Sequence, residues 1–317
     1  LFRQLQHHLW KSGETLACGH LSSHGVSVCR LRRRCLYIIA QLRVRCIFTL
    51  GGASTGRPTN VRKQGGRVAN PKVVVITGGS RGIGAETAKL FAQHGYNVCL
   101  NYVANDAAAE RVRSDILNLG VRCIAVKADV SKASDVAKLF SRVDQELGTL
   151  TVLVNNAAIL NTQARMMDIS VERFNDVLQK NVISCFLCCK EAVRRMSTHQ
   201  GGIGGSIVNV SSMAAKSGSP NEYVDYAASK GAVDTLTRGL ALEVAAEGIR
   251  VNAVRPGLIY TEMHALGGEP ERVDRLKSRI PMQRGGQPSE VADAIFWLAS
   301  DKSSFATGTM VDLAGGL

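Results

Sequence analysis

The chain has 317 residues, 45% hydrophobic and 21% charged, which excludes a disordered or fibrous protein. Its net charge of +13 is concentrated near the N-terminus. Residues 1–70 contain 12 Lys and Arg side chains and one acid, Glu14, whereas residues 71–317 contain 27 bases and 25 acids. The main part is nearly neutral, so we expect no nucleic-acid partner. No run of 18 apolar residues occurs, so we expect no membrane span.

Residues 1–70 show no sustained helical or strand periodicity, and we expect a basic, disordered leader or an artefact of the gene model. An Arg-rich, acid-poor segment would also suit an organelle transit peptide. Four potential zinc ligands lie in this segment, but their spacing matches no familiar zinc finger: Cys18, His20, His24 and Cys29. We therefore expect no metal site.

Nine cysteines are an odd number, so they cannot all pair within one chain. Cys185, Cys188 and Cys189 occupy an apolar helical run, where small buried side chains are the expected role. This cysteine usage favours a reducing compartment, and we expect the cytoplasm.

From Lys72 onward, strand-like and helical patterns alternate. Seven short β-branched or apolar runs predict strands at 73–76, 98–102, 123–126, 151–154, 207–210, 251–254 and 310–313. The intervening 3.6-residue patterns predict helices at about 83–94, 106–119, 134–147, 171–196, 226–246 and 289–299. This alternation predicts one α/β domain over residues 71–317, a Rossmann fold with a doubly wound, seven-stranded parallel sheet and helices on both faces.

A glycine-rich segment follows the first predicted strand and leads directly into a helix. Such glycines allow a tight turn and close approach of a pyrophosphate, which the helix N-terminus attracts. The expected dinucleotide-binding residues here are Thr77, Gly78, Ser80, Arg81, Gly82, Ile83 and Gly84.

The spacing TGxxxGxG resembles that of the short-chain dehydrogenase/reductase family, and the resemblance covers residues 72–317. Further family motifs follow in order: Asp129-Val130, Asn155-Asn156-Ala157-Ala158, Asn181, Ser211-Ser212, Tyr226-Ala227-Ala228-Ser229-Lys230 and Pro256-Gly257. The resemblance is strongest to the glucose 1-dehydrogenase-like and 3-oxoacyl-carrier-protein reductase-like branch.

The resemblance implies further cofactor contacts. Asp129, followed by Val130, would contact the adenine, and Asn155 with the backbone through Ala157 would close the cofactor floor. After the strand at 251–254, the backbone of Ile259 and the side chain of Thr261 would hold the nicotinamide carboxamide, following the turn at Pro256-Gly257. Ala158 departs from the family, which usually has glycine there.

The end of the second strand predicts the choice of nicotinamide cofactor. An acid at this place binds the ribose hydroxyls of NAD and repels the extra phosphate of NADP. Here the strand ends at Asn101-Tyr102, with no acid before Asp106, and the glycine-rich turn carries Arg81. We expect NADP(H) to be preferred; NAD(H) is also used if Arg81 is only a solvated surface charge.

Tyr226 and Lys230 are four residues apart on one helix face. A phenol needs nearby positive charge to act as an acid or base near neutral pH, and Lys230 can supply it. Tyr226 is thus the expected general acid in reduction and base in oxidation. Tyr223 has Ala227 at the corresponding spacing, so we expect it to line the cleft or pack.

Two more residues of the catalytic set are identified by the resemblance. Ser212 would hold the substrate oxygen, with Ser211 as the alternative, and Asn181 would hold a water that connects Lys230 to solvent. Residues 263–281, which include Gly267-Gly268, are expected to form a mobile lid over a small-molecule substrate.

These features predict an NADP-preferring oxidoreductase that interconverts a secondary alcohol and a ketone, or a sugar and its lactone. A 3-oxoacyl-carrier-protein reductase is the alternative, and a non-catalytic dinucleotide-binding sensor or scaffold is the alternative of another class. The resemblance also implies a homotetramer or homodimer formed through the helices at 171–196 and 226–246.

Overall fold

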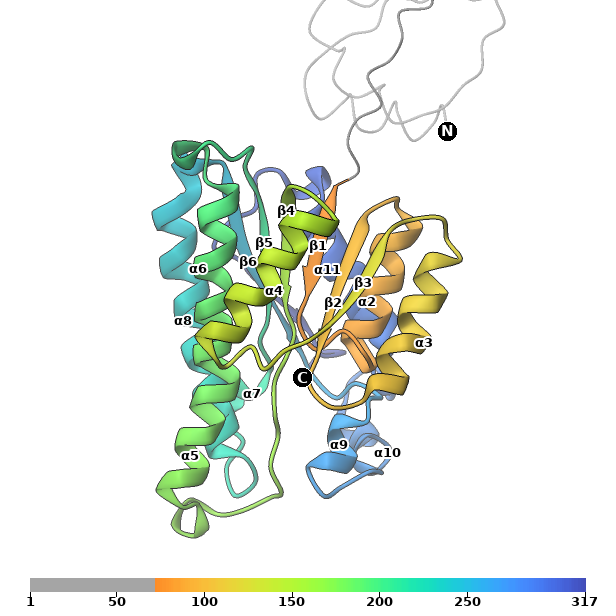
Figure 1. Ribbon diagram of the computed structural model, residues 1–317. Helices are drawn as coiled ribbons and strands as arrows, with labels where there is room; N and C mark the ends of the chain where they lie inside the picture. The colour runs from red at the N-terminus through yellow and green to blue at the C-terminus, as the bar shows by residue number, and fades with distance from the viewer. Residues whose placement is uncertain (1–71) are drawn as a thin grey trace, which may run out of the picture. The chain divides into compact units, whose positions relative to one another are not determined.

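A seven-stranded parallel sheet forms the centre of the computed structural model, which describes residues 72–317 (Figure 1). Its strands are β1 (Val73–Ile76), β2 (Asn97–Tyr102), β3 (Cys123–Lys127), β4 (Leu150–Asn155), β5 (Gly205–Val210), β6 (Ile249–Pro256) and β7 (Met310–Leu313). They lie in the order β3-β2-β1-β4-β5-β6-β7, and every neighbouring pair is parallel. The predicted fold class is confirmed.

The longer helices cover both faces of this sheet, as the fold class requires. One face carries α2 (Gly82–Gln93), α3 (Asp106–Leu117) and α11 (Pro288–Ala299). The other carries α4 (Ala133–Glu146), α6 (Ser184–Met196) and α8 (Val224–Val244). The remaining α-helices are α5 (Val171–Leu178), α7 (Ala214–Ser217), α9 (Met263–Leu266) and α10 (Arg272–Leu276).

Strand β1 shows why its continuous apolar sequence suits the centre of the sheet. All four of its residues are at most 1% exposed. Val75 packs into the core under α4 and α6, whereas Val74 packs into the core under α2 and α11. A central strand covered on both faces needs apolar side chains at every position rather than at alternate ones.

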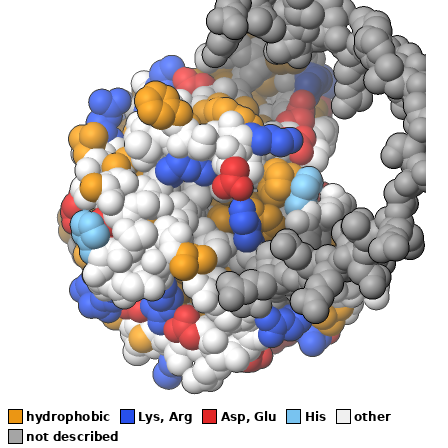
Figure 2. All heavy atoms as spheres, turned by 90° about the horizontal axis from the view of Figure 1, so that it is seen from above, with side chains coloured by type: hydrophobic (Ala, Val, Ile, Leu, Met, Phe, Trp, Pro, Cys, Tyr) orange, Lys and Arg blue, Asp and Glu red, His pale blue; other side chains and the backbone are white. Residues whose placement is uncertain are grey.

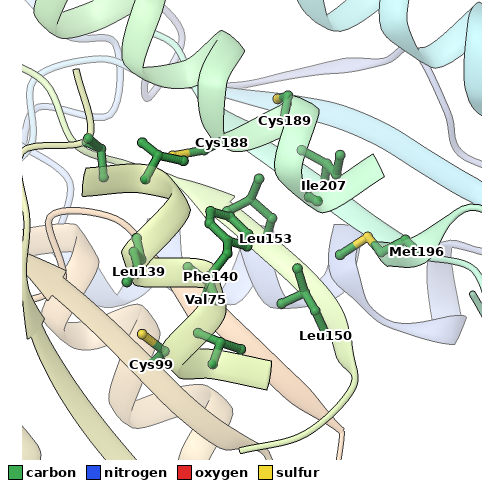
Figure 3. Close-up of a cluster of buried hydrophobic side chains, with 14 of the residues drawn as sticks. Val75, Cys99, Leu139, Phe140, Leu150, Leu153, Cys188, Cys189, Met196 and Ile207 are labelled. Carbon is green, nitrogen blue, oxygen red and sulfur yellow. The ribbon is translucent and has the colours of Figure 1, made fainter. Parts of the chain in front are cut away.

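The core under α4, α6 and α8 contains the three neighbouring cysteines of α6. Figure 3 shows Cys188 and Cys189 in the same cluster of buried side chains as Phe140 of α4 and Leu153 of β4. Cys185 is buried as well, and all three thiols are free. Burial raises the pKa of the Cys188 thiol well above its usual value, so this thiol is protonated and unreactive. Their predicted packing role is confirmed.

The order of the strands reverses beside β1, which lies between β2 and β4. The segments that leave the carboxyl ends of β1 and β4 therefore diverge toward opposite faces of the sheet. In open α/β sheets, ligands bind in the crevice formed at such a point. This topology places the glycine-rich loop after β1 next to the Asn-rich loop after β4.

The charged surface agrees with the nearly neutral composition of the main part of the chain. In the view of Figure 2, Lys and Arg side chains lie interspersed with Asp and Glu, and apolar side chains are scattered. Within residues 72–317, no helix is long and apolar enough to cross a membrane, and no cluster of His, Cys, Asp and Glu could hold a metal ion. The predictions for residues 1–70, including the leader and the rejected zinc site, lie outside the described residues.

Candidate active site

The glycine-rich loop after β1 leaves room for a dinucleotide phosphate. Gly78 and Gly82 have φ angles of +64° and +51°, which side-chain-bearing residues rarely adopt. A Cβ on Gly84 would lie 2.3 Å from the carbonyl oxygen of Gly78, so this close turn needs glycine. No side chain caps the start of α2 at Arg81. The loop and the helix N-terminus therefore fit a pyrophosphate.

Thr77 and Asn156 join the loops after β1 and β4. The Thr77 hydroxyl oxygen accepts hydrogen bonds from the backbone N–H groups of Asn156 and Ala157, both at 3.0 Å. In return, the Asn156 amide donates to the carbonyl oxygens of Thr77 and Gly78, also at 3.0 Å. Reciprocal bonds of this kind hold the two sides of the crevice in register.

Of the two adjacent asparagines at the end of β4, only Asn156 lines the large pocket. The Asn155 side chain points into the sheet interior, where it donates to Asn209 Oδ1 at 2.9 Å and to Cys189 Sγ at 3.2 Å. Sequence reasoning selected Asn155 and left out Asn156. The alternation of side chains along an extended segment is the signal that could have separated them.

Asn101, at the end of β2, supports the glycine-rich loop from behind. It is 1% exposed, and its amide donates to the carbonyl oxygens of Val126 and Ala128 at 3.2 and 2.8 Å. Its Oδ1 accepts a hydrogen bond from the N–H of Gly78 at 3.4 Å. These bonds use both polar atoms of the Asn101 side chain. Asn101 therefore positions the glycine-rich loop.

The nearest acid after β2 is already engaged. The Asp106 carboxylate pairs with Lys127 at 3.0 Å, and hydrogen bonds from Lys127 and Tyr102 lower the pKa of Asp106. By contrast, Arg81 is exposed and forms no ion pair within residues 72–317. The adenosine side of the crevice therefore carries a free cation and no free carboxylate at the end of β2.

Asp129 follows β3 and stays ionised. Its Oδ2 lies 2.7 Å from Lys180 Nζ, and its Oδ1 accepts from the N–H and the hydroxyl of Ser131 at 3.1 and 2.6 Å. Burial acts to raise the pKa of Asp129, but these partners outweigh it and hold the pKa at about 2. The Asp129 carboxylate is therefore charged, and Lys180 and Ser131 hold it in place at the end of β3. Val130 next to it is buried.

The tyrosine and lysine of α8 and the serine after β5 line one cavity of about 550 Å³. Helix α8 begins at Val224, so Tyr226 and Lys230 lie on consecutive turns of one face. Lys230 Nζ lies 5.5 Å from the centre of the Tyr226 ring and donates to the Val210 carbonyl oxygen at 2.7 Å. Ser212 is the second residue after β5, so the sheet brings it to the same cavity as the phenol.

The two serines after β5 have different environments. The Ser211 hydroxyl is buried and donates to the backbone carbonyl oxygen of Lys230 at 3.2 Å. The Ser212 hydroxyl oxygen instead accepts a hydrogen bond from the Ala214 N–H at 3.1 Å, and Ser212 lines the large cavity together with Tyr226. Both serines line this cavity, but the Ser211 hydroxyl is turned to the backbone of α8.

Burial changes both titrating groups of α8. It raises the pKa of Tyr226 to about 12, against the lowering effect of the Ser212 hydrogen bond. It also lowers the pKa of Lys230 to about 8, against the opposing effects of Cys185 and Asp234. At neutral pH the phenol is protonated and the lysine is mainly charged, so the pair consists of a proton donor beside a cation.

Asn181 lies in a π-helical turn (Gln179–Ile183) that interrupts the regular geometry of the helix predicted over 171–196. Its Oδ1 accepts from the N–H of Ile159 at 2.8 Å, and its amide donates to the Ile159 carbonyl oxygen and to Ser229, both at 3.1 Å. These bonds clamp the loop after β4 against α8. Such turns often occur at functional sites.

A small cavity of about 10 Å³ lies behind Lys230, with Asn155 and Asn181 also in its wall. This volume is close to the space that a single water molecule occupies. Asn155 Oδ1 is buried without a hydrogen-bond partner among the described residues. The cavity therefore offers polar groups for one water next to the lysine.

The loop after β6 forms the opposite wall of the large cavity, which Pro256, Gly257, Ile259 and Thr261 line. A Cβ on Gly82 would lie 3.4 Å from the Thr261 methyl group, so this loop meets the glycine-rich loop. The four predicted nicotinamide-side residues thus face the same cavity as Tyr226. Ile83 and Ala158 line it as well.

Residues 263–281, predicted to form a lid, contain α9 and α10 and contribute Met263, His264 and Leu276 to the cavity wall. Arg272 of α10 pairs with both Glu222 and Glu269. Its guanidinium lies 5.2 Å from the centre of the Tyr223 ring, and Tyr223 is buried in the cavity wall. Tyr223 thus lines the cleft and also packs against Arg272.

Comparison with known proteins agrees with this fold. The family model described as Enoyl-(Acyl carrier protein) reductase matches residues 78–317. A crystal structure of a short-chain type dehydrogenase/reductase from Mycobacterium marinum superposes with a TM-score of 0.71 at 33% identity, covering 77% of this chain and 94% of that one. The chain belongs to the short-chain dehydrogenase/reductase family and is an NAD(P)-dependent oxidoreductase acting on CH–OH groups.

Three curated relatives illustrate its place in that family. The chain is 59% identical to the "Uncharacterized oxidoreductase YgfF" of Escherichia coli, over 77% of this chain and 99% of the relative. It is 36% identical to the 3-oxoacyl-[acyl-carrier-protein] reductase FabG of Staphylococcus aureus, over 78% and 98%. It is 35% identical to Glucose 1-dehydrogenase 2 of Bacillus subtilis, over 78% and 94%.

Proposed function

We propose that the protein is an NADP-preferring oxidoreductase that interconverts a secondary alcohol and a ketone, or a sugar and its lactone, with Tyr226 as general acid and base. The observation that carries this proposal is the meeting of Tyr226, Ser212 and Lys230 in one cavity of about 550 Å³. The catalytic set also includes Asn181, which positions the loop beside them. A sensor without turnover has no chemical need for this arrangement.

When bound, the nicotinamide supplies or accepts the hydride, and the residues of this chain handle the proton. In reduction, the Ser212 hydroxyl donates to the substrate oxygen that becomes negative. The Tyr226 phenol then transfers its proton to that oxygen. The Lys230 ammonium stabilises the phenolate that remains, and a water in the small cavity connects Lys230 to further protons. Oxidation follows the reverse path.

The preference for NADP rests on the charges near the end of β2. Arg81 is exposed and without an ion-pair partner in the described part of the chain, so its guanidinium can bind a 2′-phosphate. Asp106, the acid that could disfavour that phosphate, is held by Lys127. NAD(H) remains a second cofactor if Arg81 does not reach the phosphate.

The relatives name two substrate classes, an acyl-carrier-protein thioester and glucose. We place the substrate among ketones, secondary alcohols and sugars, with 3-oxoacyl-carrier-protein reduction as the alternative. The cavity wall combines apolar side chains with a few polar groups, including Leu160, Met213, Met263, Ser217 and Ser219. A wall of this composition suits a small molecule.

We also propose a homotetramer or homodimer, working in the cytoplasm and formed through α5, α6 and α8. Ile183 and Phe186 are 39% and 46% exposed, although Cys185 and Cys188 between and beside them are buried. Leu242 of α8 is 78% exposed. Light scattering tests this directly, and a monomer at micromolar concentration would contradict it.

The decisive experiment is turnover of the full chain with NADPH and NADH in parallel, and with the oxidised forms in the reverse direction. The panel contains sugars, secondary alcohols, ketones and 3-oxoacyl thioesters. Turnover with NADPH on one chemical group would support the proposal and identify the substrate class. Tight nucleotide binding without turnover on any compound would contradict the proposed substrate classes and favour the sensor or a substrate outside the panel.

A further inference from the structure

The wall of the large cavity contains more basic than acidic side chains. One acid, Glu222, lines it, together with three bases, Lys230, Arg272 and Arg279. The Glu222 carboxylate accepts hydrogen bonds from Arg272 at 3.2 and 2.5 Å. Since this pair neutralises itself, the wall away from Lys230 has one remaining charged side chain, Arg279.

Arg279 differs from its neighbours in having no partner. It ends the short 3-10 helix Lys277–Arg279, is exposed, and forms no side-chain hydrogen bond or ion pair with any residue from 72 to 317. Lys277, two residues earlier, pairs with Asp274 at 3.0 Å. Hence the same short helix contains one cation that is satisfied and one that faces the cavity unpaired.

No other side chain in this wall is a free cation or a free carboxylate. Burial lowers the pKa of His264, so its imidazole is neutral at pH 7. Its Nε2 is hydrogen-bonded to the carbonyl oxygen of Ile259 at 3.0 Å. The remaining nearby side chains, Met263 and Leu276, are apolar. An anionic group entering the cavity would therefore meet one free guanidinium and no free carboxylate side chain.

We propose that the cavity takes a carbonyl substrate that carries an anionic group, a carboxylate or a phosphate, and that Arg279 binds this group while Tyr226 and Ser212 hold the reacting oxygen. This inference rests on the proposed oxidoreductase function and narrows its substrate class. A guanidinium suits both anions because its planar array of N–H donors matches two of their oxygens at once. Arg279 is then a specificity-determining residue.

The test compares matched anionic and neutral substrates on the full chain with saturating NADPH. Acetoacetate and methyl acetoacetate form the carboxylate pair, and acetoacetyl-4′-phosphopantetheine and acetoacetyl-pantetheine form the phosphate pair. The readout is the ratio of kcat/KM for the anionic member to that for the neutral member. The fraction of folded enzyme cancels in this ratio, so the ratio can also be measured on a variant that is partly unfolded.

We expect the wild-type ratio to favour the anion in at least one pair, and Arg279→Gln to lower that ratio by about tenfold. Arg279→Lys should retain part of the preference for the anionic substrate. A salt concentration of 0.5 M should reduce the wild-type ratio, because the contact between Arg279 and the anionic group is exposed. Lys277→Gln is the matched control, because it removes a cation from the same short helix without changing the cavity wall. Its ratio should equal that of the wild type.

Which pair shows the effect distinguishes a carboxylate from a phosphate. A wild-type ratio near one in both pairs, or an equal loss of the ratio in Arg279→Gln and Lys277→Gln, would overturn the inference while leaving the oxidoreductase function standing. If no member of either pair nor any compound of the wider panel is turned over although NADPH binds, the proposed function fails, and this inference fails with it.

Discussion

The ammonium nitrogen of Lys230 lies 5.5 Å from the centre of the Tyr226 ring, one turn further along the same face of α8. Burial acts on the two groups in opposite directions, raising the pKa of Tyr226 to about 12 and lowering that of Lys230 to about 8. The phenol therefore stays protonated across the usual assay range. Of the two groups, only Lys230 changes its charge within this pH range.

This difference predicts how carbonyl reduction depends on pH. Below pH 8 the Lys230 ammonium is charged and can stabilise the phenolate that forms on Tyr226; above pH 8 that charge is lost. We expect kcat/KM for the carbonyl substrate at saturating NADPH to fall as the pH rises through about 8. A profile that is flat from pH 7 to 9.5 would contradict this role. In Lys230→Arg, any remaining activity should lack the fall, because arginine keeps its proton.

Replacing the proton donor should separate catalysis from binding. Tyr226→Phe removes one hydroxyl and keeps the ring, so we expect turnover to fall by about 10² to 10⁴-fold. The affinity for NADPH, followed by its fluorescence, should change little. Tyr223→Phe is the matched control, because Tyr223 lines the same cavity without a lysine one turn away. The assignment fails if Tyr226→Phe keeps most of its activity.

Cofactor preference should depend on Arg81. Arg81→Ala should lower kcat/KM for NADPH by about tenfold or more and affect NADH much less, because only NADPH carries the 2′-phosphate. Lys302→Ala removes another exposed cation and serves as the control. Equal losses with NADPH and NADH, or wild-type enzyme that uses both equally well, would show that Arg81 is a surface charge without a cofactor partner.

The close turn of the glycine-rich loop should not tolerate a methyl group. In Gly84→Ala the new Cβ would lie 2.3 Å from the Gly78 carbonyl oxygen, so the loop must shift and nucleotide affinity should fall sharply. In Gly239→Ala the new Cβ meets nothing within 4 Å and lies in helix α8, so the free energy of unfolding should increase by about 0.5–1 kcal/mol. Isothermal titration with NADPH and thermal melts measure both effects. Unchanged affinity in Gly84→Ala would mean that the loop is looser than its geometry indicates.

Several features could be predicted from local sequence alone, and the reason is that each has a local physical cause. The four apolar residues of β1 are buried on both faces, the glycines of 78–84 adopt the turn that their spacing indicates, and Tyr226 and Lys230 share a helix face. The predicted strands agree with the structure to within two residues at each end. These properties depend on side-chain volume, on φ angles and on the 3.6-residue period, which act within a few residues.

Other features were decided by contacts between segments far apart in the chain. Asn156 rather than Asn155 faces the cavity, and the π-helical turn at Asn181 arises where its side chain clamps Ile159, 22 residues earlier. The pairing of Arg272 with Glu222, 50 residues away, leaves Arg279 as the free cation of the wall. Sequence determined the fold, the cofactor class and the placing of Tyr226 and Lys230 on one helix face, because these follow from local patterns. Only the tertiary structure decided which polar groups are already satisfied and which remain free to bind a ligand, because that depends on how the sheet brings distant loops together.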